Sequence, residues 1–255
     1  MSPEANVYET DELLSQYLLF HYGQPEDQLP WPNGPRDALD FPVRCVTECV
    51  DTASLPEHAR ALDLGCAVGR STFELARHCD SVIGVDFSYT FIFAARTLCR
   101  DHALPFEVLE TGSIYRELTA HLPDVPCHRV RFEQGDAQRL RPNLGSFDVV
   151  LACNLLCRLP RPQLLLERLP DLVKPGGQLV ITTPNSWLDT FTAKEYWLGA
   201  TPATGEPLEA LEAALSPHFE LVQAKDLPFL IREHRRKYQW SVAQASIWRR
   251  RQPSA

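Results

Sequence analysis

Short apolar runs alternate with amphipathic stretches along most of this chain, and this alternation predicts the fold. Strands are expected at 60–64, 81–86, 129–134, 147–153, 177–183, 219–227 and 239–249, and helices at 70–78, 88–102, 162–173 and 206–215. Strands separated by helices of this length indicate an α/β fold, in which a mostly parallel sheet has both faces covered.

Three regions depart from this rhythm. The segment Pro228–Lys237 joins the last two predicted strands and is too short for a crossover helix, so these strands should form an antiparallel pair. Residues 105–128 lie where one short loop would be enough, and we expect a small hairpin or an irregular insertion there. Residues 1–57 precede the first strand and hold helix candidates at Asp11–Tyr22 and Phe41–Val50, separated by a proline-rich loop at 24–35.

The N-terminal segment carries more aromatic and polar side chains than packing alone requires. We therefore expect residues 1–57 to be a helical lid segment that closes over the ligands with Tyr8 to about Arg44, and residues 58–255 to be the core of a single domain. The alternative is a helix pair that packs on the sheet and touches no ligand. The side chains concerned are Tyr8, Tyr17, His21, Tyr22, Trp31 and Arg44.

Composition narrows the class of partner. The 255 residues are 44% hydrophobic and 23% charged, as in ordinary globular proteins, and the net charge of −8 argues against nucleic acid. No apolar run approaches the roughly 20 residues that span a bilayer, and the N-terminus lacks the features of a signal peptide, so we expect a cytoplasmic protein. The eight cysteines lack zinc-site spacing, which predicts buried free thiols and no metal.

A glycine-containing turn marks the expected ligand site. An apolar strand runs into Gly65-Cys66-Ala67-Val68-Gly69, and a helix follows. Glycines after a strand let a ligand lie against bare backbone, near the amide groups that begin the next helix. Asp86, followed by Phe87, ends the next strand about 20 residues later, where the acid that binds a ribose is expected.

The spacing Gly65-x-Ala67-x-Gly69, led by Asp63, differs from the G-x-G-x-x-G of dinucleotide binders and resembles motif I of class I S-adenosylmethionine (SAM) methyltransferases. The carboxylate of Asp63 suits the ammonium and the sulfonium of SAM and would repel a pyrophosphate. The alternative interpretation of the whole motif is an ordinary strand–turn–helix of an α/β protein. The resemblance implies a Rossmann-like sheet of seven strands with one antiparallel strand, and it extends to Asp136 and Ala137 for adenine and to Asn154 beside the sulfonium. The implied SAM-binding residues are Asp63, Gly65, Cys66, Ala67, Gly69, Asp86, Phe87, Asp136, Ala137 and Asn154.

Four further stretches resemble a narrower family, and together the resemblance covers nearly the whole chain. They are 17–23, 154–160, 226–234 and 239–245, and they are similar to the mercaptohistidine N-methyltransferases that act last in ovothiol biosynthesis. In other proteins this methyltransferase is the C-terminal domain of the sulfoxide synthase. The resemblance implies methyl transfer from SAM to an imidazole nitrogen of 5-thiohistidine, by a standalone methyltransferase.

Such an acceptor needs alignment more than a strong base, because a neutral ring nitrogen already has an in-plane lone pair. Alignment can be worth about 7–11 kcal/mol. Asn154 and Asn185 are candidates to accept a hydrogen bond from the other ring nitrogen, and Trp187 is a candidate to stack on the ring. Candidates for the carboxylate are Arg44, Arg158 and Arg232; Tyr8 and Tyr17 would contact the substrate from the lid. Another small acceptor, or a non-catalytic SAM-binding or NAD-binding module, remains the alternative.

Overall fold

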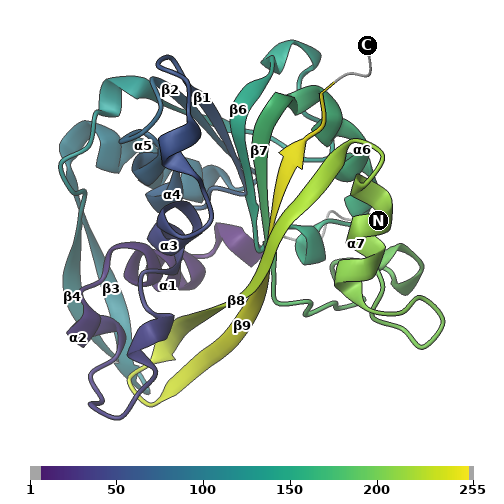
Figure 1. Cartoon of the computed structure of the whole chain (residues 1–255). Helices are drawn as coiled ribbons and strands as arrows, with labels where there is room; N and C mark the ends of the chain where they lie inside the picture. The colour runs from purple at the N-terminus through teal and green to yellow at the C-terminus, as the bar shows by residue number, and fades with distance from the viewer. Residues whose placement is uncertain (1–6, 253–255) are drawn as a thin grey trace, which may run out of the picture.

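A seven-stranded sheet forms the centre of the computed structural model, which describes residues 7–252 (Figure 1). The strand order is β5-β2-β1-β6-β7-β9-β8. β9 runs antiparallel to both of its neighbours, and every other neighbouring pair of this sheet is parallel. This confirms the predicted α/β fold with one antiparallel strand. The strands are β1 (Arg60–Leu64), β2 (Ser81–Asp86), β5 (Val130–Gln134), β6 (Phe147–Cys153), β7 (Val173–Thr183), β8 (Phe219–His234) and β9 (Lys237–Arg250).

Successive residues of the central strands point to opposite faces of the sheet, so each face needs its own helices. Leu62 and Leu64 pack with apolar residues of α6 (Pro162–Leu172) and α7 (Pro207–Leu215). Ala61 packs on the other face, with residues of α3 (Phe41–Thr47) and α4 (Arg70–Leu75). Beside α4 lies α5 (Tyr89–Asp101). Ser88 caps its N-terminus, and the hydroxyl of Ser88 accepts a bond from the backbone N–H of Phe91 at 3.1 Å.

Two predicted helices are shorter in the structure. The helices α3 and α4 end at Thr47 and Leu75, before the predicted Val50 and His78.

The burial of the cysteines differs in part from the prediction. All eight cysteines are free, but Cys99, Cys127 and Cys153 are half-buried rather than buried. None of the helices between residues 7 and 252 is long and apolar enough to cross a membrane.

The expected insertion is a hairpin. β3 (Ala103–Thr111) and β4 (Ile114–His121) pair with each other in a separate two-stranded sheet, which we call the hairpin. It lies beyond the carboxyl edge of the main sheet, on the side of α5 (Figure 1).

The connection expected at Pro228–Lys237 is wrong, because β8 and β9 continue through it. Pairing of β7 with β9 ends at Thr183 and Gln244, whereas pairing of β8 with β9 runs on to His234 and Lys237. Residues 226–243 therefore project past the carboxyl edge of the sheet, and we call this part the ribbon (Figure 1). Helices help to support the ribbon, since Phe229 packs against Phe41 of α3 with ring centroids 5.0 Å apart.

The predicted helix at Asp11–Tyr22 is α1, with the same bounds. The hydroxyl of Thr10 caps it by accepting from the backbone N–H of Leu13 at 3.3 Å. Leu18 and Leu19 pack with residues of the hairpin, and Phe20 packs against Phe229 of the ribbon at 6.2 Å. The helix therefore lies between hairpin and ribbon, next to the short α2 (Pro25–Gln28).

Candidate cofactor and acceptor site

Register between neighbouring strands brings the sequence-predicted residues to one edge of the sheet. Leu64 pairs with Val85 on one side and with Ala152 on the other, so the turn at 65–69 lies between the ends of β2 and β6. Pairs Asp86–Gln134 and Cys153–Thr182 extend the edge in both directions. Along this carboxyl edge the order is therefore Asp136, Asp86, the glycine loop at 65–69, Asn154 and Asn185.

Left-handed backbone gives the glycine loop its shape. Gly65, Ala67 and Gly69 have φ of 70°, 48° and 90°. A Cβ on Gly69 would lie 2.6 Å from Cζ of Phe132, and one on Gly65 would lie 3.0 Å from Cδ1 of Leu155. The sequence tolerates a methyl group only at the middle position, Ala67.

Asp86 ties the glycine loop to the end of β2. Its Oδ2 accepts from the backbone N–H of Ala67 at 2.9 Å, and its Oδ1 accepts from that of Ser88 at 2.9 Å. Burial raises the pKa of Asp86 to about 6, and these two backbone bonds oppose the rise. A carboxylate oxygen can accept more than one bond, so this group can also take the paired hydroxyls of a ribose.

Asp63 binds protein groups rather than the expected ligand space. It is 1% exposed, and its Oδ2 accepts from the hydroxyls of Ser71 and Thr72, both at 2.7 Å. Burial raises the pKa of Asp63, and the two hydroxyl bonds oppose the rise. The carboxylate thus fixes the first turn of α4 beneath the glycine loop.

Beyond β5, Asp136 shapes the turn that was expected to meet adenine. Its Oδ1 accepts from the backbone N–H of Gln138 at 2.8 Å, and Ala137 beside it is buried. The ring of Phe87, which also borders this end of the edge, is 57% exposed.

The helix α1 lies against the glycine loop. The hydroxyl of Tyr22 donates to the carbonyl of Val68 at 2.7 Å. Burial lowers the pKa of His21 to about 3, with the charge of Arg70 adding to the effect, so this imidazole is neutral at physiological pH. Its Nδ1 is buried and has no partner within residues 7–252.

Tyr8 and Glu9 contact the segment that follows β2. The carbonyl of Tyr8 accepts from the hydroxyl of Ser88 at 2.9 Å, and the carboxylate of Glu9 accepts from the backbone N–H groups of Tyr89 and Thr90 at 2.9 and 3.0 Å. Burial raises the pKa of Tyr8, while the neighbouring Arg158 lowers it. Segments far apart in sequence thus meet beside Asp86.

Tyr8, Tyr17 and Arg158 are therefore brought together, as the acceptor hypothesis requires. The rings of Tyr8 and Tyr17 are 6.2 Å apart. Arg158 donates from Nη1 to the carbonyl of Ser186 at 3.0 Å, and its guanidinium lies over the ring of Phe191 at 4.9 Å. The stacked ring and the carbonyl together hold the planar guanidinium in one orientation.

Asn154 and Asn185 each lie just after a strand. Both residues adopt the left-handed backbone conformation, with φ of 51° and 53°. The Oδ1 of Asn154 accepts from the hydroxyl of Thr182 at 3.0 Å. The Oδ1 of Asn185 is buried and has no hydrogen-bond partner in the described part of the chain. A buried acceptor without a partner is costly, which marks Asn185 as a position where a ligand donor fits.

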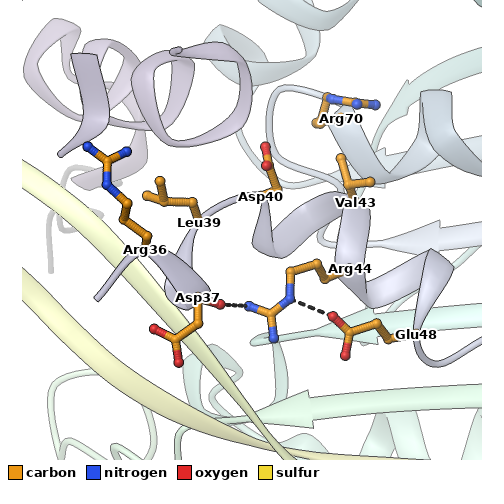
Figure 2. Close-up of a pocket in the computed structure, with 8 residues that line it drawn as sticks. All are labelled: Arg36, Asp37, Leu39, Asp40, Val43, Arg44, Glu48 and Arg70. Atoms are coloured by element: carbon orange, nitrogen blue, oxygen red, sulfur yellow. Dashed lines mark hydrogen bonds and ion pairs between the residues drawn. The ribbon is translucent and has the colours of Figure 1, made fainter. Parts of the chain in front are cut away.

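The three other acceptor candidates contact protein groups. Trp187 is 7% exposed and packs in the core beside Trp197, with ring centroids 6.3 Å apart. Arg44 donates from Nε to Glu48 at 2.6 Å and lines an open pocket of about 630 Å³ between α3 and the start of α4 (Figure 2). Arg232 is buried and paired with Glu110 at 2.9 Å. Both guanidinium groups are thus engaged by the protein.

The sequence analysis did not identify the residues that hold the predicted site residues in place. Glu9, Ser88 and Phe191 hold Tyr8 and Arg158 in place, while Ser71 and Thr72 hold Asp63. Only Ser88 had a local signal, as a serine directly before an apolar helix pattern.

Comparisons with known proteins agree with this geometry. Residues 62–181 match the family model for a methyltransferase domain. The ubiquinone biosynthesis O-methyltransferase of Alkalilimnicola ehrlichii is 31% identical over 168 residues, which is 64% of this chain and 56% of that protein. The trans-aconitate 2-methyltransferase of Deinococcus radiodurans is 31% identical over 153 residues, 58% of this chain and 46% of that protein. This chain thus spans about half the length of the curated relatives it matches.

Solved structures share the fold. A SAM-dependent methyltransferase of Methanosarcina mazei aligns with a TM-score of 0.54 and 20% identity, over 78% of this chain and 95% of that one. The N-methyltransferase NodS of Bradyrhizobium japonicum, in complex with S-adenosylhomocysteine, aligns with a TM-score of 0.52 and 14% identity, over 94% and 99%.

This chain therefore contains a methyltransferase domain over residues 62–181, and its sheet has the Rossmann-like methyltransferase fold. SAM is the cofactor that the matched domain uses. The edge fits it, because the left-handed glycine loop leaves backbone bare and Asp86 retains capacity for a diol.

Proposed function

We propose that this chain transfers the methyl group of SAM to an imidazole nitrogen of 5-thiohistidine, the last step of ovothiol biosynthesis. The four stretches that resemble the mercaptohistidine N-methyltransferases support this proposal. In the structure they form the end of α1, the segment after β6 and much of the ribbon, all of which border the carboxyl edge. A resemblance in segments that border the proposed ligand site bears more on acceptor specificity than a resemblance in the sheet does.

The observation that carries the proposal is the pairing of an unpartnered acceptor with a fixed guanidinium. The buried Oδ1 of Asn185 is one residue from Ser186, whose carbonyl holds Arg158. An imidazole amino acid offers a ring N–H to such an acceptor and a carboxylate to such a guanidinium. These two contacts would hold both ends of one small molecule.

The chemistry at this edge follows from the acceptor. SAM, when bound, supplies an electrophilic methyl group. By accepting a hydrogen bond from the ring N–H, Oδ1 of Asn185 would hold the tautomer whose other nitrogen has the free lone pair, so no base is required before the attack. The rings of Tyr8 and Tyr17 would exclude water from this end of the site.

An acceptor screen tests the proposal. The thiolate of 5-thiohistidine donates electron density to the ring, so its kcat/KM should exceed that of histidine by orders of magnitude; ergothioneine serves as a second comparison. Asn185→Ala should lower kcat/KM with 5-thiohistidine about 5–150-fold, the equivalent of 1–3 kcal/mol for a lost bond to a buried group, and leave SAM affinity unchanged. Similar kcat/KM values for 5-thiohistidine and histidine would contradict the assignment.

A second candidate is methyl transfer to an oxygen of another small molecule. It is favoured by the curated relatives, whose names are those of O-methyltransferases and of trans-aconitate 2-methyltransferase. Phenolic and carboxylic acceptors therefore belong in the same screen, and turnover of one of them without 5-thiohistidine turnover would favour this candidate. Calorimetric titration with SAM and with NAD identifies which of the two ligands binds, and SAM binding without turnover of any acceptor in the screen would favour a binding module without activity.

A further inference from the structure

Beyond the carboxyl edge, the hairpin and the ribbon lie on either side of α1, and we call these two elements the jaws. Leu18 and Leu19 of α1 pack with Phe106 and Val108 of the hairpin. On the other side of the helix, Phe20 packs against Phe229 of the ribbon. The position of α1 thus depends on how far apart these two jaws stand.

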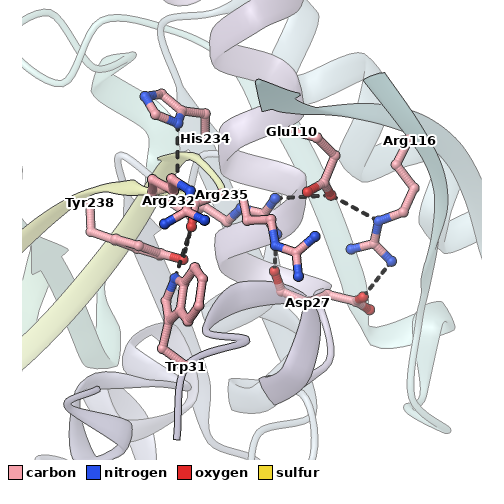
Figure 3. Close-up of polar contacts among 9 residues, drawn as sticks. Asp27, Trp31, Glu110, Arg116, Arg232, His234, Arg235 and Tyr238 are labelled. Carbon is pink, nitrogen blue, oxygen red and sulfur yellow. Dashed lines mark hydrogen bonds and ion pairs between the residues drawn. The ribbon is translucent and has the colours of Figure 1, made fainter. Parts of the chain in front are cut away.

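An ion network joins the tips of the jaws (Figure 3). Glu110 of the hairpin pairs with Arg232 of the ribbon at 2.9 Å and accepts from Nε of Arg116 at 2.9 Å. Arg116 also pairs with Asp27 of α2 at 2.9 Å, and Nη1 of Arg232 donates to the carbonyl of Asp27. The backbone N–H of Arg235 donates to the carbonyl of Glu110 at 3.2 Å. Three segments distant in sequence thus share one network.

The Arg232–Glu110 pair of the network is largely buried, so its charges are costly to desolvate, whereas the side chain of Arg116 is 44% exposed. The side chain of Arg232 is 2% exposed and that of Glu110 is 16% exposed. A buried ion pair often adds no net stability over apolar residues of similar size, but its geometry can select one arrangement of the chain. Here the selected arrangement is the spacing of the jaws.

The network acts on the site through α1. Tyr22 of that helix holds the carbonyl of Val68 in the glycine loop, and Tyr17 packs on Tyr8 and on Phe91 at 4.8 Å. A shift of α1 therefore displaces both the cofactor loop and the aromatic wall of the acceptor site.

We propose that Glu110 is a positioning residue: its ion pairs with Arg232 and Arg116 lock the jaws, and the locked jaws hold α1 against the glycine loop in the geometry that binds SAM. This inference rests on the class of the enzyme and on the proposed site, but not on which acceptor is methylated.

The test measures SAM affinity by calorimetry and hydrogen exchange of α1 by mass spectrometry, in the full-length chain. The double variant Glu110→Leu/Arg232→Leu removes both buried charges, so its Tm should stay near that of the wild type. Its Kd for SAM should rise at least about fivefold, the lower limit of an ordinary coupling between two sites, and amides of 18–22 should exchange faster. Arg116→Gln, which removes only the half-exposed arm of the network, should give a smaller change in the same direction.

Glu233→Gln is the matched control. It breaks the ion pair with Lys237 at 2.6 Å, which lies within the ribbon and does not reach the hairpin. It should leave SAM affinity and exchange of α1 at wild-type values. Restoration by Glu110→Asp of part of the affinity lost in Glu110→Gln would show that the carboxylate matters rather than the side-chain volume.

The proposal is overturned if the folded double variant and Arg116→Gln both bind SAM with wild-type affinity and show wild-type exchange of α1. If the double variant does not fold, Arg116→Gln alone decides. Because the readouts use SAM and not the acceptor, failure of the 5-thiohistidine assay leaves this test intact.

Discussion

Among single residues, Asp86 is the one whose carboxyl group holds the backbone of the glycine loop and is also proposed to bind the ribose of SAM. Burial raises its pKa to about 6, above the usual value near 3.8. The folded protein therefore binds a proton on Asp86 between about pH 4 and 6 that the unfolded chain has released, so this group favours folding increasingly as the pH falls through that window. A ribose diol donates its bonds to the ionised form, so the opposite dependence is expected for SAM.

We predict that the Kd for SAM rises about tenfold per pH unit below pH 6, because one proton must leave before the diol can bind. Calorimetry between pH 4.5 and 8 measures this. In Asp86→Asn the affinity at pH 8 should be lower than that of the wild type, since the amide has one acceptor oxygen and its NH2 group cannot accept the second backbone bond, and the pH dependence should be flat. A wild-type slope that survives in Asp86→Asn would assign the titration to another group.

Two positions of the glycine loop should respond in opposite ways to a methyl group. Gly69→Ala should destabilise the protein by more than about 1–2 kcal/mol, because the left-handed conformation costs that much for a side chain and the new Cβ would meet Phe132 at 2.6 Å. Ala67→Gly should be close to neutral, since relief of the left-handed strain offsets the greater freedom of the unfolded chain. Urea unfolding of both variants measures the difference, and equal losses would contradict the strain argument.

Among the elements, the short 3-10 helix η1 (Val7–Glu9) closes on the N-terminus of α5 through one carboxylate. Desolvation opposes ionisation of Glu9, but its bonds to Thr90 and Tyr89 outweigh this, and the net pKa is lowered. Glu9→Ala should release this segment and Tyr8 with it. We expect a raised KM for the acceptor with a small change in Tm, because Glu9 lies at the surface and not in the core. Parallel assays of KM and Tm decide; a large loss of Tm with unchanged KM would make Glu9 a purely structural cap.

The sequence predicts the core elements well because their apolar periodicity is local. The bounds of α1, β1, β2 and β6 follow directly from that pattern. It does not predict the ribbon, since Pro228 and the charged residues after it are typical of a connection. They form strands because β8 and β9 pair with each other and pack on Phe20 and Phe41, contacts far apart in sequence.

At the scale of the whole molecule, contacts between residues far apart in sequence also limit how much of the site the sequence predicts. The residues proposed to surround SAM can be grouped from the sequence because parallel strands bring their carboxyl ends to one edge. Arg232 was expected to bind a carboxylate, and it does bind one, but that carboxylate is Glu110 of the hairpin. No local pattern distinguishes a guanidinium that binds a ligand from one that closes the fold, because its partner is defined only once the chain has folded.

The packing of α1 leads to a prediction about the N-terminal segment as a whole. As a separate lid, residues 1–40 should be removable, leaving a folded core without activity. In the structure, however, Leu18 and Leu19 are almost fully buried against the hairpin, and Phe20 is 6% exposed against the ribbon. Removing a single buried aromatic side chain costs about 3–5 kcal/mol, a large part of the 5–15 kcal/mol that stabilises a typical domain.

We therefore expect a chain of residues 41–255 to lose cooperative unfolding, because the jaws would face each other across an empty apolar space. Near-ultraviolet circular dichroism and binding of a hydrophobic dye would report this as lost tertiary signal and raised fluorescence. The Glu9→Ala variant is the matched control, since it releases only the segment before α1 and should unfold cooperatively. Cooperative unfolding of residues 41–255 near the wild-type Tm would show instead that α1 is a lid on a core that folds without it.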